Sequence, residues 1–271
     1  MKTDYHFHHG DSPILISIPH VGTHIPSEIA RNMTAAALKI PDVDWHVNLL
    51  VDFAKDLGAS ILTATTMRYV IDLNRASDNS PLYPKQESTG LCPIDTFDKQ
   101  AIYLHGKKPD EAEIKTRVIQ YWQPYHDKLA LELKRIRTKH GIAILWDAHS
   151  IKSEVPRLFI GKLPNLNIGT ADSTSCAASL QHGIESILQQ SILAQNYSHV
   201  CNGRFKGGYI TRHYGQPADN IHAIQLEISQ CCYMQETAPY TYKPHLAKDL
   251  KFLLRELIQS SMLWANKCQE I

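Results

Sequence analysis

The sequence lacks long apolar runs and an excess of charge of either sign. No stretch approaches the roughly 18 consecutive apolar residues that a membrane-spanning helix needs. The first residues, MKTDYHFHHGDSP, lack the apolar core of a secretory signal peptide. Lysine and arginine total 28 against 27 acidic residues, so no net field attracts nucleic acid or anionic lipid. We therefore expect a cytoplasmic protein with neither nucleic-acid nor membrane partners.

Three common catalytic or metal-binding motifs are also absent. The six cysteines form no CxxC pair, which excludes zinc-finger spacing and favours free thiols. The chain has neither the HExxH helix of zinc peptidases nor the GxSxG elbow of serine hydrolases. Ser150 follows His149 directly, but adjacent strand residues point to opposite faces, which argues against a serine–histidine pair. Histidine is abundant at 15 residues, and this surplus favours metal or acid–base chemistry.

Short apolar runs alternate with amphipathic segments, a pattern typical of an α/β sheet with helices on both faces. The runs predict strands at 14–18, 59–64, 68–73, 142–146, 198–201 and 223–228. Helical spacing and end signals predict helices over 44–57, 109–139 with a kink at Pro124, 176–190 and 245–266. We expect a single domain over residues 1–271, with a loose tail at 1–11 and a long surface loop at 76–108.

Two histidines follow predicted strands. His20 lies in PHVGTH after the 14–18 strand, and His149 lies in DAH after the 142–146 strand. Ligands of α/β sheets bind beyond the carboxyl ends of strands, so both imidazoles are expected to open into one crevice. Two imidazoles, a carboxylate and a position for water form the usual catalytic zinc set. Asp42, Asp44 and Asp147 are candidates for the carboxylate, and we favour Asp44. Taken singly, each histidine is also consistent with a local hydrogen bond.

A glutamate stands inside an otherwise apolar strand. In the 223–228 run, Gln225 and Glu227 lie on one face, and Leu226 and Ile228 lie on the other. A buried carboxylate is costly unless it is paired or used. Glu227 is therefore either the partner of an arginine or lysine, or a general base that activates water and passes its proton to a leaving nitrogen.

Fixed cations gather in two short segments. RYVIDLNR contains Arg68, Asn74 and Arg75. The glycine-rich stretch NGRFKGGYITRHYG contains Arg204, Lys206, Arg212 and His213. Arginine binds a carboxylate through two parallel hydrogen bonds, so this composition favours a loop that closes on an anionic substrate. For any one of these arginines, a solvated surface position is the simpler alternative.

Together these motifs resemble a known family, the N-formylglutamate amidohydrolases. The matching segments occur in the family's order from about residue 12 to residue 265: LISIPHVGTHIP, PDVDW, RYVIDLNR, LYP with TGLCP, YWQPYH, ILWDAHS, NGRFKGGYITRHYG and HAIQLE. The resemblance implies release of formate from N-formyl-L-glutamate, the last step of one route of histidine degradation. It also implies a three-layer α/β/α domain with a mixed central sheet, similar to zinc carboxypeptidases and aspartoacylases.

The resemblance further implies a ligand set for one divalent ion, expected to be zinc. In the wider group a histidine, an acid and a second histidine hold the ion, and His20 and His149 take the histidine places. In that group the acid follows the first histidine by three positions, but Thr23 stands there in this chain. Asp44 is the candidate replacement by position and chemistry, and His24 is a weaker alternative.

Roles around the substrate are implied as well. Arg68 resembles the arginine that polarises the scissile carbonyl, and Glu227 resembles the base. Asn74 and Arg75 resemble the pair that holds a substrate carboxylate. Arg212 is expected to bind the second carboxylate of a small dicarboxylate substrate, an inference drawn from the glycine-rich loop.

Two other functions fit parts of the pattern. An amidohydrolase for another N-acyl acidic amino acid, such as acyl-aspartate or succinyl-glutamate, would use the same ligands and base. A non-catalytic anion-binding domain on the same scaffold would lack the zinc ligands or the base, whereas all of these candidates are present here. A peptidoglycan peptidase is less well supported, because we find neither an export signal nor an extra binding module.

Overall fold

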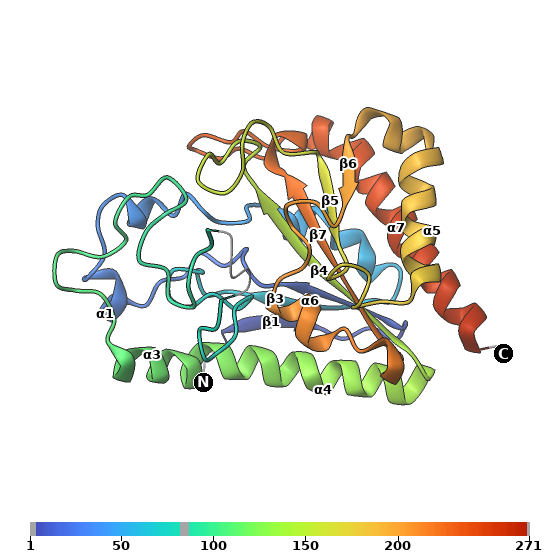
Figure 1. The fold of residues 1–271 in the computed structure, drawn as a ribbon, viewed down its shortest axis with the longest axis horizontal. Helices are drawn as coiled ribbons and strands as arrows, with labels where there is room; N and C mark the ends of the chain where they lie inside the picture. The colour runs from blue at the N-terminus through green and yellow to red at the C-terminus, as the bar shows by residue number, and fades with distance from the viewer. Residues whose placement is uncertain (1–3, 82–86, 270–271) are drawn as a thin grey trace.

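A seven-stranded mixed sheet forms the centre of the computed structural model, which describes residues 4–81 and 87–269 (Figure 1). The strands are β1 (Tyr5–His8), β2 (Ile14–Ile18), β3 (Ser60–Ala64), β4 (Ala143–Ile151), β5 (Leu166–Gly169), β6 (His199–Cys201) and β7 (Ile221–Ser229). Their order is β1-β3-β2-β4-β7-β5-β6. The inner strands β3, β2, β4 and β7 are parallel, whereas β1 and β5 run antiparallel to their neighbours β3 and β7.

Helices cover both faces of this sheet. Alternate residues of the buried strands separate into two cores: Leu15, Leu145 and Ala223 pack toward α4 (Gln123–His140). Their neighbours in sequence pack toward α5 (Ala178–Gln190) and α7 (Pro244–Gln269). Figure 1 shows α4 below the sheet and the α5–α7 pair on the opposite side. The predicted three-layer α/β/α architecture with a mixed sheet is confirmed.

The apolar runs located most strands correctly, with three differences. β4 extends beyond the predicted 142–146 run, because Asp147 and His149 continue its ladder with β7. β5 was not predicted, since four residues give too short a signal. Residues 5–8, expected within a loose tail, form the edge strand β1 on β3.

The predicted strand over 68–73 is wrong. Residues 68–70 form a turn, and the Asp72 amide donates to Leu91 O rather than to a neighbouring strand. Side-chain contacts decide the conformation, because Arg68 pairs with Asp72 four positions later. Between them, Tyr69 and Val70 pack against α1 (Ser27–Ala30) and against the buried Ile102 and Tyr103.

The predicted helix over 44–57 is broken into α2 (Val47–Leu50) and a 3₁₀ turn at Asp52–Lys55. His46 has φ of 64°, a left-handed conformation that prevents a helix from starting at Asp44. Asp44 is not a helix cap. Its carboxylate instead accepts hydrogen bonds from the amide of Ser150 in β4.

The helical segment expected at 109–139 has three parts. α3 (Glu111–Arg117) is capped by Asp110, and a π-helical turn over Val118–Trp122 then leads into α4. Pro124 therefore lies in the first turn of α4, where its missing amide hydrogen costs nothing. Gly141 ends α4 with φ of 69°, as predicted.

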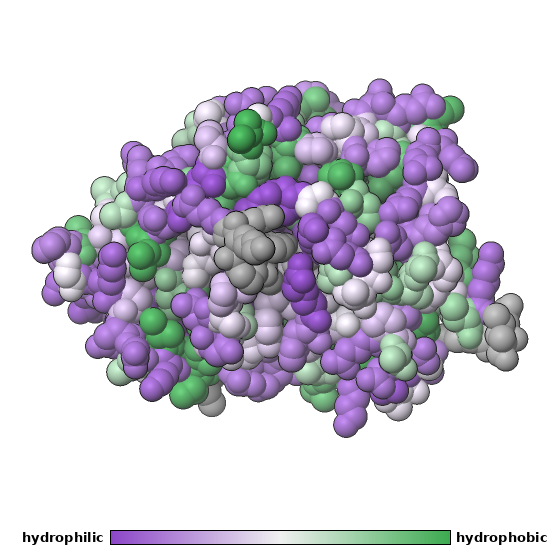
Figure 2. All heavy atoms as spheres, in the orientation of Figure 1, coloured by the Kyte–Doolittle hydropathy of each residue, from purple (hydrophilic) through white to green (hydrophobic). Residues whose placement is uncertain are grey.

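The segment 76–108 contains no helix or strand in its described part, 76–81 and 87–108. It is not simply a surface loop, since Leu91, Thr96, Phe97 and Tyr103 are buried. Figure 2 shows hydrophilic residues spread over the viewed face, with apolar residues in small separate groups. Within the described ranges, no helix has the length and apolar character required to cross a membrane.

Buried His126 predicts a specific loss of stability in acid. Its Nε2 donates to Leu73 O at 2.9 Å, and burial lowers the pKa of His126 to about 3. The unfolded chain takes up a proton at this residue below pH of about 6.5, whereas the folded protein does not, so stability falls as the pH falls. Between pH 6.5 and 5, protonation of this residue in the unfolded chain is expected to lower the free energy of unfolding by about 2 kcal/mol.

Urea unfolding at pH 7.5 and pH 5 tests this expectation. His126→Gln is expected to show a smaller loss of unfolding free energy on acidification than the wild type, because the titrating group is gone. His182→Gln, at an exposed position on α5, is the matched control. An equal drop in unfolding free energy between pH 7.5 and pH 5 in His126→Gln and wild type would show that His126 does not cause the loss of stability in acid.

Candidate metal and substrate site

Three predicted ligands converge at the carboxyl end of the inner strands. His20 follows β2, Asp44 lies in the loop before α2, and His149 belongs to β4. Asp44 Oδ2 lies 3.1 Å from His149 Nδ1 and 3.7 Å from His20 Nδ1. One ligand atom from each residue lies within 4.8 Å of the others, and the three residues are 1–3% exposed. Two imidazole nitrogens and a carboxylate oxygen suit a divalent ion, so this group can hold one.

A second carboxylate stands behind each histidine. His20 Nε2 lies 2.8 Å from Asp72 Oδ1, and His149 Nε2 lies 3.0 Å from Asp147 Oδ2. A proton donated from each Nε2 leaves the Nδ1 lone pair facing Asp44, which is the arrangement that metal-binding histidines need. Asp72 was not singled out from the sequence, although an acid inside the apolar run YVIDL was a usable signal.

These contacts decide between the candidates for the third ligand. Asp147 lies behind the His149 ring rather than between the two histidines. Asp42 accepts hydrogen bonds from Tyr69 and from the Phe97 amide, away from the group. His24 is exposed and pairs with Thr66 through its backbone. Asp44 is therefore the carboxylate that faces both imidazoles.

The charges around the group favour a cation. Burial opposes the charged form of His149, but the carboxylates of Asp147 and Asp44 prevail and raise its pKa well above the usual value. Burial raises the pKa of Asp72, but the neighbouring His20 and Arg68 outweigh this effect and hold the pKa of Asp72 well below its usual range. With their pKa values lowered, Asp44 and Asp72 remain ionised, and the site attracts positive charge at neutral pH.

Glu227 lies beside this group on the same face of the sheet. His149 and Glu227 are register partners in the parallel strands β4 and β7. Burial raises the pKa of Glu227 to about 8. Gln225 Oε1 accepts from the Gly208 amide at 2.6 Å, and its Nε2 points to Glu227 Oε2 at 3.4 Å. Within residues 4–81 and 87–269, no arginine or lysine forms an ion pair with Glu227, so the alternative of a structural salt bridge is not supported.

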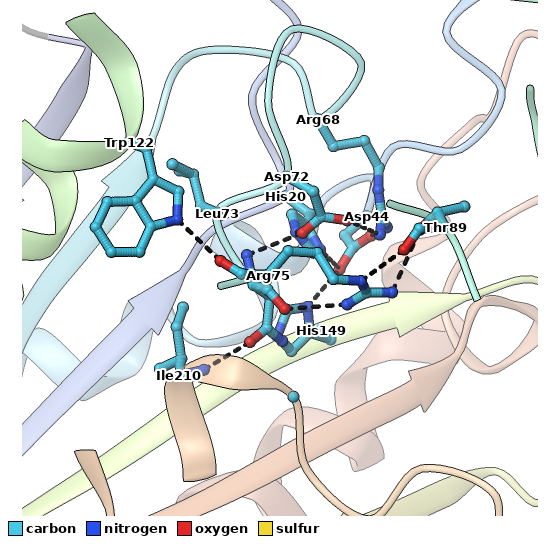
Figure 3. Close-up of polar contacts among 12 residues, drawn as sticks. His20, Asp44, Arg68, Asp72, Leu73, Arg75, Thr89, Trp122, His149 and Ile210 are labelled. Atoms are coloured by element: carbon cyan, nitrogen blue, oxygen red, sulfur yellow. Dashed lines mark hydrogen bonds and ion pairs between the residues drawn. The ribbon is translucent and has the colours of Figure 1, made fainter. Parts of the chain in front are cut away.

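The turn over residues 72–75 connects the site to several elements, as Figure 3 shows. Arg68 Nη2 donates to Asp72 Oδ2 at 2.7 Å and Nη1 lies 3.5 Å from Asp44 Oδ1. Asn74 Oδ1 accepts from the Ile210 amide at 2.8 Å, and Asn74 Nδ2 lies 3.0 Å from His149 Nε2. Arg68 and Asn74 therefore lie at the predicted ligand group.

Backbone contacts fix the end of this turn. Arg75 Nε donates to Thr89 O at 2.8 Å, and Arg75 O accepts from Trp122 Nε1 at 2.9 Å. Trp122 ends the π-helical turn before α4, and its indole ring contacts the end of the 72–75 turn. Gly208 must be glycine, because a Cβ atom there would lie 2.2 Å from Asn74 Nδ2.

One cavity connects these groups. Its wall combines the ligand group and Glu227 with cations, polar residues and a few apolar side chains: Arg68, Asn74, Arg75, Glu87, Ser88, Thr89, Phe97, Ser150, Ile151, Leu158, Arg204, Phe205, Gly208 and Gln225. Arg212 is not among the lining residues. It is exposed on α6 (Tyr209–Tyr214), and its Nε donates to Gly207 O. The predicted contact between Arg212 and a substrate carboxylate stays a prediction.

Asp147→Asn is expected to weaken binding of Zn²⁺ by about 10- to 100-fold, because a neutral amide oxygen is a weaker acceptor than a carboxylate for the proton that fixes the His149 ring. Competition with a chelating dye measures the dissociation constant. Asp56→Asn removes an exposed acid and is the control. Equal affinity of Asp147→Asn and wild type would show that Asp147 does not support a ligand.

Fold and site together define an α/β/α protein with a buried two-histidine, one-aspartate group that can hold a metal ion. The sequence profile of the family described as N-formylglutamate amidohydrolase matches residues 12–234. The chain belongs to this family, as the resemblance predicted.

Individual relatives agree with this assignment. The chain is 46% identical over 258 residues to the N-formylglutamate deformylase of Pseudomonas putida, with 95% of each chain covered. It is 46% identical over 261 residues to the N-formylglutamate deformylase of Pseudomonas aeruginosa, covering 96% of this chain and 97% of the relative. The crystal structure of N-formylglutamate amidohydrolase from Ralstonia eutropha has a TM-score of 0.79 at 23% identity, with 98% of both chains covered, and so shares the fold.

Proposed function

We propose that the protein hydrolyses N-formyl-L-glutamate to formate and L-glutamate in a metal-dependent reaction, the last step of histidine degradation. The convergence of His20, Asp44 and His149 beside the buried Glu227 is the observation that carries this proposal. The names of the two Pseudomonas relatives support the choice of substrate. The mixed imidazole and carboxylate ligand set favours zinc, and manganese or cobalt suit similar ligands.

An ion held by these three residues would supply Lewis acidity, which lowers the pKa of a water molecule and polarises the formyl carbonyl. Glu227 then accepts a proton from the attacking water and donates it to the departing glutamate nitrogen. The burial that raises the pKa of Glu227 suits it to holding that proton between the two steps. Positive charge at the adjacent ligand group favours the carboxylate form that must act first.

Cationic side chains are proposed to bind the rest of the reacting molecule. Arg68 is fixed by Asp72 and Asp44 and lines the cavity, so its guanidinium can stabilise the negative charge that develops on the carbonyl oxygen. Arg75, with Asn74 beside it, is proposed to hold the α-carboxylate. Because formyl is very small, the preference for this substrate must come mainly from the glutamate half.

Formate release from purified protein tests the proposal. The protein loaded with Zn²⁺ is expected to hydrolyse N-formyl-L-glutamate faster than N-acetyl-L-glutamate, N-succinyl-L-glutamate or N-formyl-L-aspartate. A higher kcat/KM on a different N-acyl acidic amino acid would assign the other amidohydrolase activity. Binding of these compounds without hydrolysis of any would instead indicate an anion-binding domain.

A further inference from the structure

We propose that Arg204 binds the side-chain carboxylate of the substrate and so determines the preference for an acidic amino acid. This inference rests on the proposed function and adds a residue to it. The glycine-rich stretch 202–215 carries four basic side chains, and among the described residues that line the cavity it contributes Arg204 as its cation. Arg204 therefore takes the place predicted from sequence for Arg212.

The other cations of this stretch are directed elsewhere. Lys206 Nζ lies 2.9 Å from Asp172 Oδ1 at the surface. Arg212 contacts Gly207 O, and the exposed His213 ring stacks on Tyr209. The path of the backbone thus brings the first cation of the stretch, rather than a later one, to the wall of the cavity.

Backbone carbonyls orient the Arg204 guanidinium. Its Nε donates to Leu158 O at 2.6 Å, and its Nη2 donates to Glu87 O at 3.0 Å. Both acceptors are neutral carbonyls, and the two bonds set the orientation of the guanidinium. The Glu87 carboxylate lies 2.9 Å from Arg157 Nε. The Arg204 carbon Cζ lies 5.3 Å from the Phe205 ring centre, and an apolar neighbour of this kind strengthens a charge-assisted contact.

Arg75 is anchored next to Arg204. Arg75 donates to Thr89 O, and Arg204 donates to Glu87 O, so both guanidiniums bind one short segment. Residues two apart are separated by at most about 7 Å along the chain. A compact dicarboxylate can therefore bridge them, with the α-carboxylate at Arg75 and the side-chain carboxylate at Arg204. Its amide is then directed toward the ligand group and Glu227, which line the same cavity.

The loop that carries Arg204 is tied to the sheet on both sides. The Asn202 amide donates to Ile168 O in β5 at 2.7 Å, and Lys206 O accepts from the Ala171 amide at 2.6 Å. The Gly208 amide then donates to Gln225 Oε1 in β7, two residues from Glu227. Arg204 is thereby held before substrate arrives, which reduces the entropic cost of binding.

Kinetics on two substrates test the proposal. N-formyl-L-glutamine has the same size as N-formyl-L-glutamate but carries a neutral side-chain amide. Arg204→Met is expected to lower kcat/KM for N-formyl-L-glutamate by roughly 10²-fold, chiefly through KM, and to change the value for N-formyl-L-glutamine little. Arg204→Lys keeps the positive charge without the planar guanidinium. Its kcat/KM for N-formyl-L-glutamate is expected to lie between those of wild type and Arg204→Met.

Lys206→Met is the matched control, since it removes a surface cation from the same loop and should keep the wild-type preference. An equal loss on both substrates in Arg204→Met, or no loss on either, would overturn the assignment. If wild type releases no formate, the proposed function fails. Calorimetry with glutarate then tests Arg204 separately, and equal affinity of wild type and Arg204→Met would overturn the inference.

Discussion

Glu227→Gln is expected to lower kcat for formate release by roughly 10²- to 10⁴-fold, with little change in KM or in bound metal. Glutamine has the same shape as glutamate but cannot accept the proton of the attacking water. Glu227 is a register partner of His149 rather than one of the three converging ligands, so the ion site should stay intact. Steady-state kinetics and metal analysis of the same preparation measure both quantities.

The same substitution is expected to maintain or increase stability. Burial raises the pKa of Glu227 to about 8, so the charged form destabilises the fold increasingly as the pH rises from the unfolded value toward 8. A neutral amide removes this penalty. Glu236→Gln is the control. It also replaces a glutamate by glutamine, but at a residue whose carboxylate accepts a hydrogen bond from Ser153. Wild-type turnover in Glu227→Gln would remove Glu227 from the reaction, and loss of metal would make it a ligand instead.

Removal of the ion is expected to abolish formate release, and added Zn²⁺ is expected to restore it. His149→Ala should lose both metal and activity, because the imidazole bridges Asp44 and Asp147 at the centre of the site. Metal content and turnover after dialysis against a chelator, with and without added Zn²⁺, provide the measurement.

Ser150→Ala is the matched control for this experiment. The Ser150 amide donates to Asp44, and this backbone contact survives the substitution. Turnover near the wild-type level is expected in Ser150→Ala, together with normal metal binding. Full activity of the chelated wild type combined with an inactive Ser150→Ala would favour a serine nucleophile and contradict the metal-dependent reaction.

The parts of the fold that the sequence predicted depend on continuous apolar runs. The strands β2, β3, β4 and β7 are buried on both faces, so each contains a run rich in apolar residues. The segment 68–73 has the same appearance but forms a turn, because a run of apolar letters does not reveal that Asp72 will pair with both Arg68 and His20. Local pattern cannot report contacts between residues distant in sequence.

The site was predicted unevenly for a related reason. His20 follows β2 and His149 lies near the end of the adjacent parallel strand β4, so topology brings them together. Asp44 was chosen for its chemistry and position. The helix expected to begin there is absent, because the Asp44 carboxylate accepts a hydrogen bond from the Ser150 amide in β4. Arg212 and Arg204 could not be distinguished by composition, because the path of the glycine-rich loop depends on its contacts with β5 and β7.

The pairing of β4 with β7 places His149 opposite Glu227 in a parallel ladder. Neighbouring strands lie about 4.8 Å apart, so the peptide hydrogen bonds of the sheet set the spacing between ion ligand and proton acceptor. The arginines proposed to recognise substrate, Arg75 and Arg204, are carried instead by connections and are anchored on residues 87–89. In the proposed reaction, selectivity and bond cleavage therefore reside on separate parts of the architecture. Grafting a new recognition loop should redirect the protein to other acylated amino acids while the cleavage apparatus stays in place.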